Sequence, residues 1–172
     1  MTLVVFVRGV NVGGHKTFRP SVLAKELRTY GVTSIGAAGT FVVRKPGSRA
    51  KFRAALLRKL PFEAEIAICN AADIARVVKK HPFEEDPPAG VVRFVSILPK
   101  AIPRVAAIPV AVPSESEWLV RLIASRGQFV FGVYRRHMKT IGYLGRMDRL
   151  VGARGTVRNW NTILAVARAL ES

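Results

Sequence analysis

The stretch LVVFV, Leu3–Val7, decides the fold class of this chain. It is a continuous apolar run rich in β-branched residues, which is typical of a central strand covered on both faces. The chain has 172 residues and is 49% hydrophobic, enough to bury a core in one compact domain or in two small halves. Its apolar runs are too short to cross a bilayer or to form a signal peptide, so we expect a cytoplasmic protein without a membrane segment.

The segments that follow this strand predict a ferredoxin-like order. Residues 20–30 predict a helix that starts with a proline and stops at Gly31, and residues 32–35 and 40–44 predict two short strands. Ser48 is a suitable cap for a second helix that ends at Pro61. Residues 64–69 then alternate as a strand does. The resulting order, βαββαβ, is that of the ferredoxin-like plait.

The rest of the chain predicts a looser copy of this arrangement. A helix capped by Asn70 ends at Pro82, and the proline-rich acidic stretch 84–90 predicts a linker. A strand at 91–98, a proline-broken stretch, a hairpin at 118–134, an irregular segment, the strand-like TVRNW and a final helix follow. We therefore expect an α+β fold in which two ferredoxin-like (α/β plait) halves, residues 1–83 and 91–172, pack into one compact unit.

Charge is the strongest feature of the composition. The chain has 28 basic and 11 acidic residues, a net charge of +17. Residues 1–86 hold 15 basic and 7 acidic residues, and residues 87–172 hold 13 and 4, so the excess belongs to the folded body and not to a tail. Such a field attracts polyanions, with nucleic acid as the obvious partner. Drift of a whole proteome toward arginine in a GC-rich genome explains the same excess without any ligand.

The loop after the first strand, VRGVNVGGHKT at Val7–Thr17, is the first candidate anion site. It is not a Walker loop, because His15 separates the second glycine from Lys16 and Pro20 would fall inside the helix that such a loop requires. Gly13 and Gly14 would let the backbone approach an anion, with Arg8 and Lys16 beside it. A tight strand-to-helix turn with a solvated basic rim is the simpler interpretation.

The stretch TVRNWNT, Thr156–Thr162, is the second candidate site. Asn159, Asn161 and Thr162 are all helix-capping types, and a helix N-terminus beside Arg158 would attract a phosphate or a carboxylate. Two roles are open for Trp160. It stacks on a base, or it seals the last helix against a sheet, and the second is the commoner role of tryptophan.

These two stretches, together with HPF at His81–Phe83, resemble the motifs of a widespread family of small bacterial proteins described only as a domain of unknown function. The family opening is similar to LLRGINVGG and its close to TxRNWNT. The resemblance spans the chain and implies an α+β fold of two plait-like halves, without implying a reaction. Where the family tends to read SGN, this chain has Ala38, Gly39 and Thr40, which removes two polar groups.

Other chemistry finds little support in the residues. The three histidines lack metal-ligand spacing, so we expect no metal site, and nothing indicates a cofactor. Cys69 ends an alternating stretch and predicts a buried, inert thiol. The segment RGQFVFGVY, Arg126–Tyr134, is a near miss to an RNA-recognition motif, with Phe129 and Phe131 on one face that we expect to be packed inside.

Three functions stay open at this point. The chain is a binding module for a phosphate-bearing ligand, with nucleic acid favoured by charge. Alternatively, it is an enzyme acting on a small phosphorylated or carboxylated metabolite oriented by Asn11, Asn159 and Asn161, or a structural protein whose end motifs only pack the halves together. The candidate ligand-binding residues are Arg8, Asn11, Gly13, Gly14, Lys16, Arg158, Asn159, Asn161 and Thr162.

Overall fold

The computed structural model describes residues 1–9 and 18–172. Two compact units emerge: residues 1–80 with 162–172, and residues 81–161. The boundaries expected from the linker at 84–90 stay a prediction, and in the structure the segment Thr162–Ser172 is counted with the first unit.

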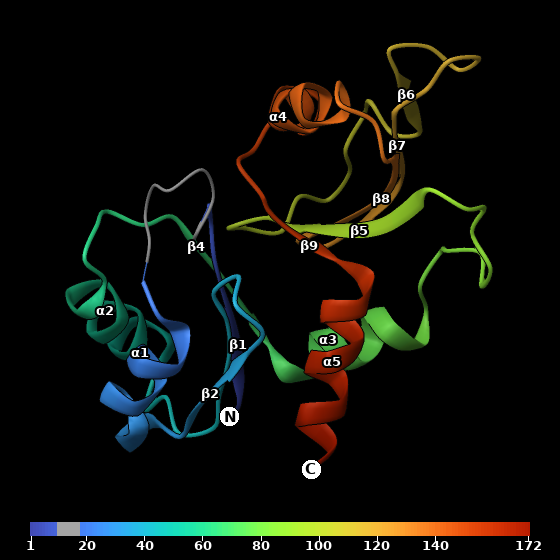
Figure 1. Ribbon diagram of the computed structural model, residues 1–172. Coiled ribbons are helices and arrows are strands. Elements are labelled where there is room, and N and C mark those ends of the chain that lie inside the picture. The colour runs from blue at the N-terminus through green and yellow to red at the C-terminus, as the bar shows by residue number, and fades with distance from the viewer. Residues whose placement is uncertain (10–17) are drawn as a thin grey trace. The chain divides into compact units, whose positions relative to one another are not determined.

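The first unit contains a four-stranded antiparallel sheet in the order β2-β3-β1-β4 (Figure 1). Its strands are β1 (Leu3–Val7), β2 (Val32–Ile35), β3 (Thr40–Val43) and β4 (Ile66–Asn70). Its helices are α1 (Pro20–Glu26), the 3₁₀ turn Arg28–Tyr30, α2 (Arg49–Lys59) and α3 (Ala71–Lys79), together with most of α5 (Trp160–Glu171). The chain order β1-α1-β2-β3-α2-β4 with this strand order is the ferredoxin-like arrangement expected from the sequence.

Local signals fix the ends of these helices. Pro20 occupies the first turn of α1, and Gly31 adopts a left-handed conformation, φ 64°, where the 3₁₀ turn stops. The Ser48 hydroxyl accepts a hydrogen bond from the Lys51 amide at the start of α2, at 3.1 Å. At the start of α3, the Asn70 amide donates to the Asp73 carboxylate, at 3.3 Å. The predicted starts of these helices are therefore confirmed. The helix predicted over residues 20–30 ends earlier than expected, at Glu26, and continues as the separate 3₁₀ turn Arg28–Tyr30.

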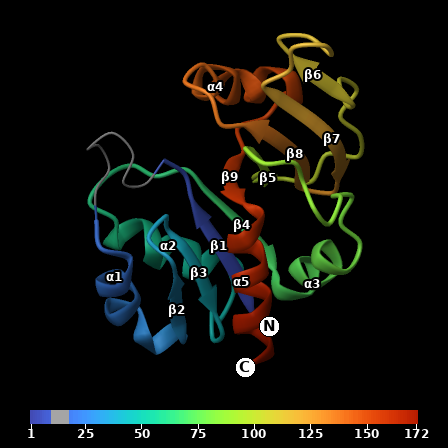
Figure 2. The same cartoon turned by 45° about the vertical axis from the view of Figure 1, so that its right-hand side comes forward.

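Strand β1 is the buried centre of the first unit. All five of its residues are inaccessible to solvent. Leu3, Val5 and Val7 join a cluster with residues of α1 and α2, whereas the alternate side chains, Val4 and Phe6, are buried on the other face. Figures 1 and 2 show α1 and α2 on one side of this sheet, with α5 running along its other side. The prediction of a strand covered on both faces is confirmed.

The second unit contains a five-stranded antiparallel sheet in the order β6-β7-β8-β5-β9. The strands are β5 (Val91–Ile97), β6 (Val110–Val112), β7 (Val120–Arg126), β8 (Phe129–Arg135) and β9 (Thr156–Asn159), and the helix is α4 (Thr140–Val151). Without β6, the order β7-β8-β5-β9 repeats that of the first unit, and α4 follows β8 as α2 follows β3. A proline-rich stretch that includes β6 stands where the first helix of a plait would be, because prolines break helices. The looser plait-like half is confirmed.

Two elements differ from the sequence-based expectations. Residues expected to be irregular form the twelve-residue helix α4, and β6 lies inside the proline-broken stretch. Gly142 and Gly145 each lower the helix propensity of α4 by about 1 kcal/mol, which hides the helix in the sequence. Burial of Thr140, Met147 and Val151, which lie on one helical face, overrides that local preference.

The core of the second unit lies between its sheet and α4. Phe94, Val120, Leu122 and Val130 pack there against Met147. Strand alternation gives the sheet a second face, which carries Val95, Ile97, Phe129 and Phe131, all buried. Burial of the two phenylalanines confirms that the near miss to an RNA-recognition motif does not offer its rings to bases.

Candidate functional site

The structure describes five of the nine predicted ligand-binding residues. Asn11, Gly13, Gly14 and Lys16 lie outside the described residues, so the predicted anion seat in that loop stays a prediction. Arg8 belongs to the first unit. Arg158, Asn159 and Asn161 belong to the second, and Thr162 is counted with the first.

Arg8 follows β1 directly and is tied to the segment that precedes β4. Its amide donates to the Glu65 carbonyl at 2.9 Å, and its Nε lies 4.0 Å from Glu65 Oε2. The next residue, Gly9, has φ 67°, a conformation that favours glycine. A turn therefore includes Gly9, the glycines predicted to turn at positions 13 and 14 lie outside the described residues, and Arg8 already has one carboxylate beside it.

Arg158 lies in β9 opposite Val95 and is buried, with 7% of its surface exposed. Its Nη1 donates to the Val157 carbonyl at 2.9 Å. Burial lowers the pKa of the guanidinium to about 10, so the group remains protonated at neutral pH. A cation this deep suits a positioning role better than direct contact with a large polyanion.

The residues around Trp160 show what the closing motif does inside the second unit. The Trp160 ring is only 3% exposed, and its centroid lies 5.2 Å from that of His81 and 5.1 Å from that of Phe83. Phe83 also meets Phe131 edge-on at 5.8 Å. The HPF and RNW motifs therefore meet in one aromatic cluster, and the packing role expected for Trp160 is confirmed. Its neighbours Asn159 and Asn161 are exposed.

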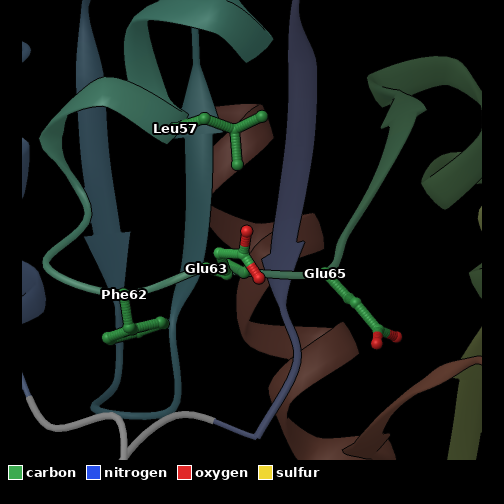
Figure 3. Close-up of a pocket in the computed structure, with 5 residues that line it drawn as sticks. Leu57, Phe62, Glu63 and Glu65 are labelled. Carbon is green, nitrogen blue, oxygen red and sulfur yellow. The ribbon is translucent and has the colours of Figure 1, made fainter.

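A pocket of about 710 Å³ opens beside β4 in the first unit (Figure 3). Its described lining combines Leu57, Phe62 and Ala64 with the exposed Glu63 and Glu65. The Glu65 carboxylate is also the one that faces Arg8. This described lining includes no basic residue, so it does not form a phosphate seat by itself.

Metal and thiol chemistry find no structural support in the described part of the chain. Over residues 1–9 and 18–172, no group of three His, Cys, Asp or Glu side chains is arranged to hold a metal ion. Cys69 is fully buried, and burial raises the pKa of its thiol to about 12, with a further contribution from Asp73. The expectation of a buried thiol is confirmed, and its raised pKa favours a low reactivity.

A cluster that the sequence did not reveal lies at the start of β7. The guanidinium carbon of Arg135 is 4.1 Å from the centroid of the Trp118 ring, and that of Arg121 is 4.6 Å from it. Trp118 and Arg121 are half-buried, and Arg135 is exposed. Such contacts between arginine and tryptophan hold the cations in place next to an aromatic surface. The hairpin predicted at residues 118–134 could have indicated this cluster, because antiparallel pairing brings the start of its first strand beside the end of its second strand.

Comparisons with known proteins agree with the fold and assign no activity. The model of a family described as "Protein of unknown function (DUF1697)" matches residues 1–117. Among solved structures, the chain is similar to the conserved bacterial protein SP0830 from Streptococcus pneumoniae, with a TM-score of 0.68 and 16% identity over 98% of each chain. No curated protein matches the chain. Within the described residues, no helix is both long enough and apolar enough to cross a membrane.

Proposed function

We propose that this chain, which belongs to the DUF1697 family of proteins of unknown function, binds nucleic acid through its basic surface. The observation that carries this proposal is a charge imbalance that no internal pairing can remove. The 11 acidic residues cannot neutralise 28 basic ones even if every carboxylate formed an ion pair. The uncompensated cations favour a ligand with many negative charges.

The excess positive charge is spread over the surface of both units. Helix α2, in the first unit, has five exposed basic residues and no acidic one. They are Arg49, Lys51, Arg53, Arg58 and Lys59. In the second unit, Arg135 at the end of β8 and Arg136 and Lys139 in the segment before α4 are exposed. A polymer with regularly spaced phosphates suits a spread of cations better than a single phosphate group does.

A small phosphorylated metabolite has less support among the described residues. The described lining of the pocket beside β4 contains two acidic residues, Glu63 and Glu65, and no basic one, which disfavours an anionic substrate. The buried Arg158 has little surface to offer. A polyanion that lies on the outside of the molecule needs no such pocket.

The predicted end-motif residues belong to this proposal as candidate contacts. Asn159 and Asn161 are exposed and suited to donate hydrogen bonds to phosphate oxygens. Gly13, Gly14 and Lys16 would add backbone amides and one cation to the set. Arg8 and Arg158 would contribute positive charge, the second from a buried position.

Fluorescence anisotropy with labelled oligonucleotides tests the proposal. We expect the protein to bind 20-nucleotide single strands and duplexes at 50 mM salt, and we expect mononucleotides to compete poorly. Replacing Lys51 and Arg53 by glutamate should weaken binding, whereas replacing the neighbouring exposed Ala50 and Ala54 by serine, a charge-neutral control on the same helix, should not. Absence of binding at 50 mM salt, or tight binding of mononucleotides alone, would overturn the proposal.

A further inference from the structure

The face of the second unit's sheet that lies away from α4 carries a row of arginines. Arg93 in β5 and Arg121 in β7 both pair with Val133 of β8, which lies between them. Directly paired residues point to the same side of a sheet, and residues two apart in one strand do so too, so Arg135 shares this face. Their sequence neighbours Phe94, Val120 and Tyr134 point to the α4 side, where they join its core cluster.

Trp118 fixes two of these arginines. Its ring lies within 4.6 Å of the guanidinium carbons of both Arg121 and Arg135, as described above. An arginine held over an aromatic ring in this way can still donate N–H hydrogen bonds to oxygen acceptors. Stacking restricts the side chains, so less conformational freedom is lost when they bind a phosphate. We call Arg93, Trp118, Arg121, Val133 and Arg135 the Trp118 surface.

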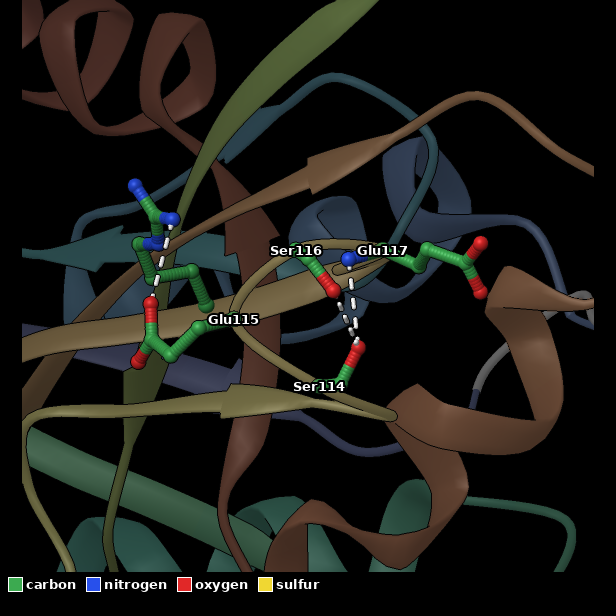
Figure 4. Close-up of polar contacts among 5 residues, drawn as sticks. Ser114, Glu115, Ser116 and Glu117 are labelled. Atoms are coloured by element: carbon green, nitrogen blue, oxygen red, sulfur yellow. Dashed lines mark hydrogen bonds and ion pairs between the residues drawn. The ribbon is translucent and has the colours of Figure 1, made fainter.

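Acidic and carbonyl groups nearby occupy part of this surface and leave part of it available. Arg121 Nη2 lies 3.4 Å from Glu115 Oε2, and Arg93 donates to the main-chain carbonyls of Glu84 and Glu85. Figure 4 shows Glu117 pointing away from Glu115, on the opposite side of the turn held by the Ser114 and Ser116 hydroxyls. Arg135 is exposed. It is therefore the arginine of this surface best placed to meet a ligand.

We propose that the Trp118 surface binds single-stranded nucleic acid, with Arg135 and Arg121 holding phosphates and a base stacking on the Trp118–Arg135 pair. This inference rests on the proposed function and adds its site and strand preference. A base is free to stack on a protein aromatic or guanidinium group only when it is unstacked from its neighbours, as in a single strand. In a duplex, the paired bases are enclosed and only the phosphates would reach the arginines.

Variants of this surface test the inference. Trp118→Ala should weaken single-strand binding on the order of tenfold, in the range measured when stacking aromatics are truncated elsewhere, and should change duplex binding less than twofold. Trp118→Phe should restore much of the loss, since phenylalanine keeps an aromatic face. Arg135→Gln should weaken single-strand binding more than Arg136→Gln, because both arginines are exposed but Arg135 is the one of the two whose guanidinium lies over the ring.

Tryptophan fluorescence gives a second readout on the same proteins. Adding a single strand should quench the emission of the wild type, and the quenching should disappear in Trp118→Phe, in which the buried Trp160 is the remaining tryptophan. This readout, and Arg135→Gln, keep the test valid if Trp118→Ala unfolds.

The outcomes separate the two proposals. If the wild type binds no nucleic acid, the proposed function fails and the inference falls with it. If the wild type binds, but the Trp118 and Arg135 variants bind as it does and no quenching occurs, only the inference is overturned.

Discussion

Replacing Gly132 by alanine adds one methyl group in the centre of the second unit's sheet, and we expect it to destabilise that unit strongly. Gly132 pairs with Phe94 on one side and with Leu122 on the other. A Cβ at this position would lie 2.7 Å from Phe94 Cε1 and even closer to Cζ of the same ring, and 2.9 Å from the Arg121 carbonyl oxygen. Carbon atoms pack without strain at about 3.5–4.0 Å.

The cost follows from what would have to move. Phe94 is fully buried and its ring lies 5.9 Å from that of Tyr134, so it has little room to turn aside. The Arg121 carbonyl belongs to a central strand. Overpacking of this kind costs about 1–3 kcal/mol, and a clash with both a rigid ring and the backbone places this site near the upper end. For a chain of this length, that loss corresponds to a Tm lower by roughly 6–12 °C.

Thermal unfolding followed by circular dichroism measures the effect, with Gly142→Ala as the matched control. Gly142 lies in α4, where an added Cβ would meet no atom within 4 Å, so the same substitution should raise stability by about 0.5–1 kcal/mol. Combining Gly132→Ala with Phe94→Leu should cost less than the sum of the two single changes, because the smaller side chain makes room. A Gly132→Ala protein as stable as the wild type, or strict additivity in the double variant, would refute this reasoning.

The remaining predictions concern a cap, a thiol and a second close approach. Ser48→Ala should destabilise by about 1 kcal/mol, because the Lys51 amide loses its acceptor; Ser48→Asp should keep most of that stability, and equal unfolding midpoints for all three would contradict the capping role. Cys69 should resist a disulfide reagent in the native protein and react quickly in denaturant; fast native labelling would show that the thiol is accessible. The pKa of this thiol is raised to about 12 in the folded state, so its contribution to stability is complete below pH 9 and is lost as the pH rises toward 12. Urea titrations at pH 8 and pH 10.5 would detect this loss as a fall in the unfolding midpoint. The Cys69→Ala variant should lack that fall. Gly155→Ala should lower Tm because its Cβ would collide with Ser96 Oγ, and combining it with Ser96→Gly should recover part of the loss; an unchanged Tm in the single variant would contradict the close approach.

The first plait could be predicted from sequence because its signals are local and agree with one another. The apolar run at Leu3–Val7, the stop at Gly31 and the cap at Ser48 each specify one element boundary without reference to distant residues. Helix α4 could not be predicted in this way. Its stability comes from burying Met147 and Val151 in the core, a tertiary effect that outweighs the low helix propensity of Gly142 and Gly145.

The candidate sites also differ in whether local sequence signals or tertiary packing determine them. The packing role of Trp160 follows from the burial statistics of tryptophan, and the structure confirms it. The burial of Arg158 was harder to foresee, because an arginine in a short strand is usually exposed. The Trp118 surface depends on the pairing of β7 with β8, which places the residues just before β7 beside the end of β8, so its arginines come together only once the register is known.

The resemblance to a family of unknown function is confirmed by the match over residues 1–117, and the specific roles of its end motifs stay predictions. Both motifs contain residues that the structure shows in packing or pairing positions, such as Trp160 in the aromatic cluster and Arg8 beside Glu65. These positions give residues of both stretches a role in the fold of this chain.

The dependence of nucleic-acid affinity on salt concentration tests the proposed function most directly. If exposed cations neutralise about six phosphates, the logarithm of the association constant should fall linearly with the logarithm of salt concentration, and the affinity should drop on the order of a thousandfold between 50 and 200 mM. An affinity that is unchanged over this range would show that the net charge of +17 does not serve nucleic-acid binding.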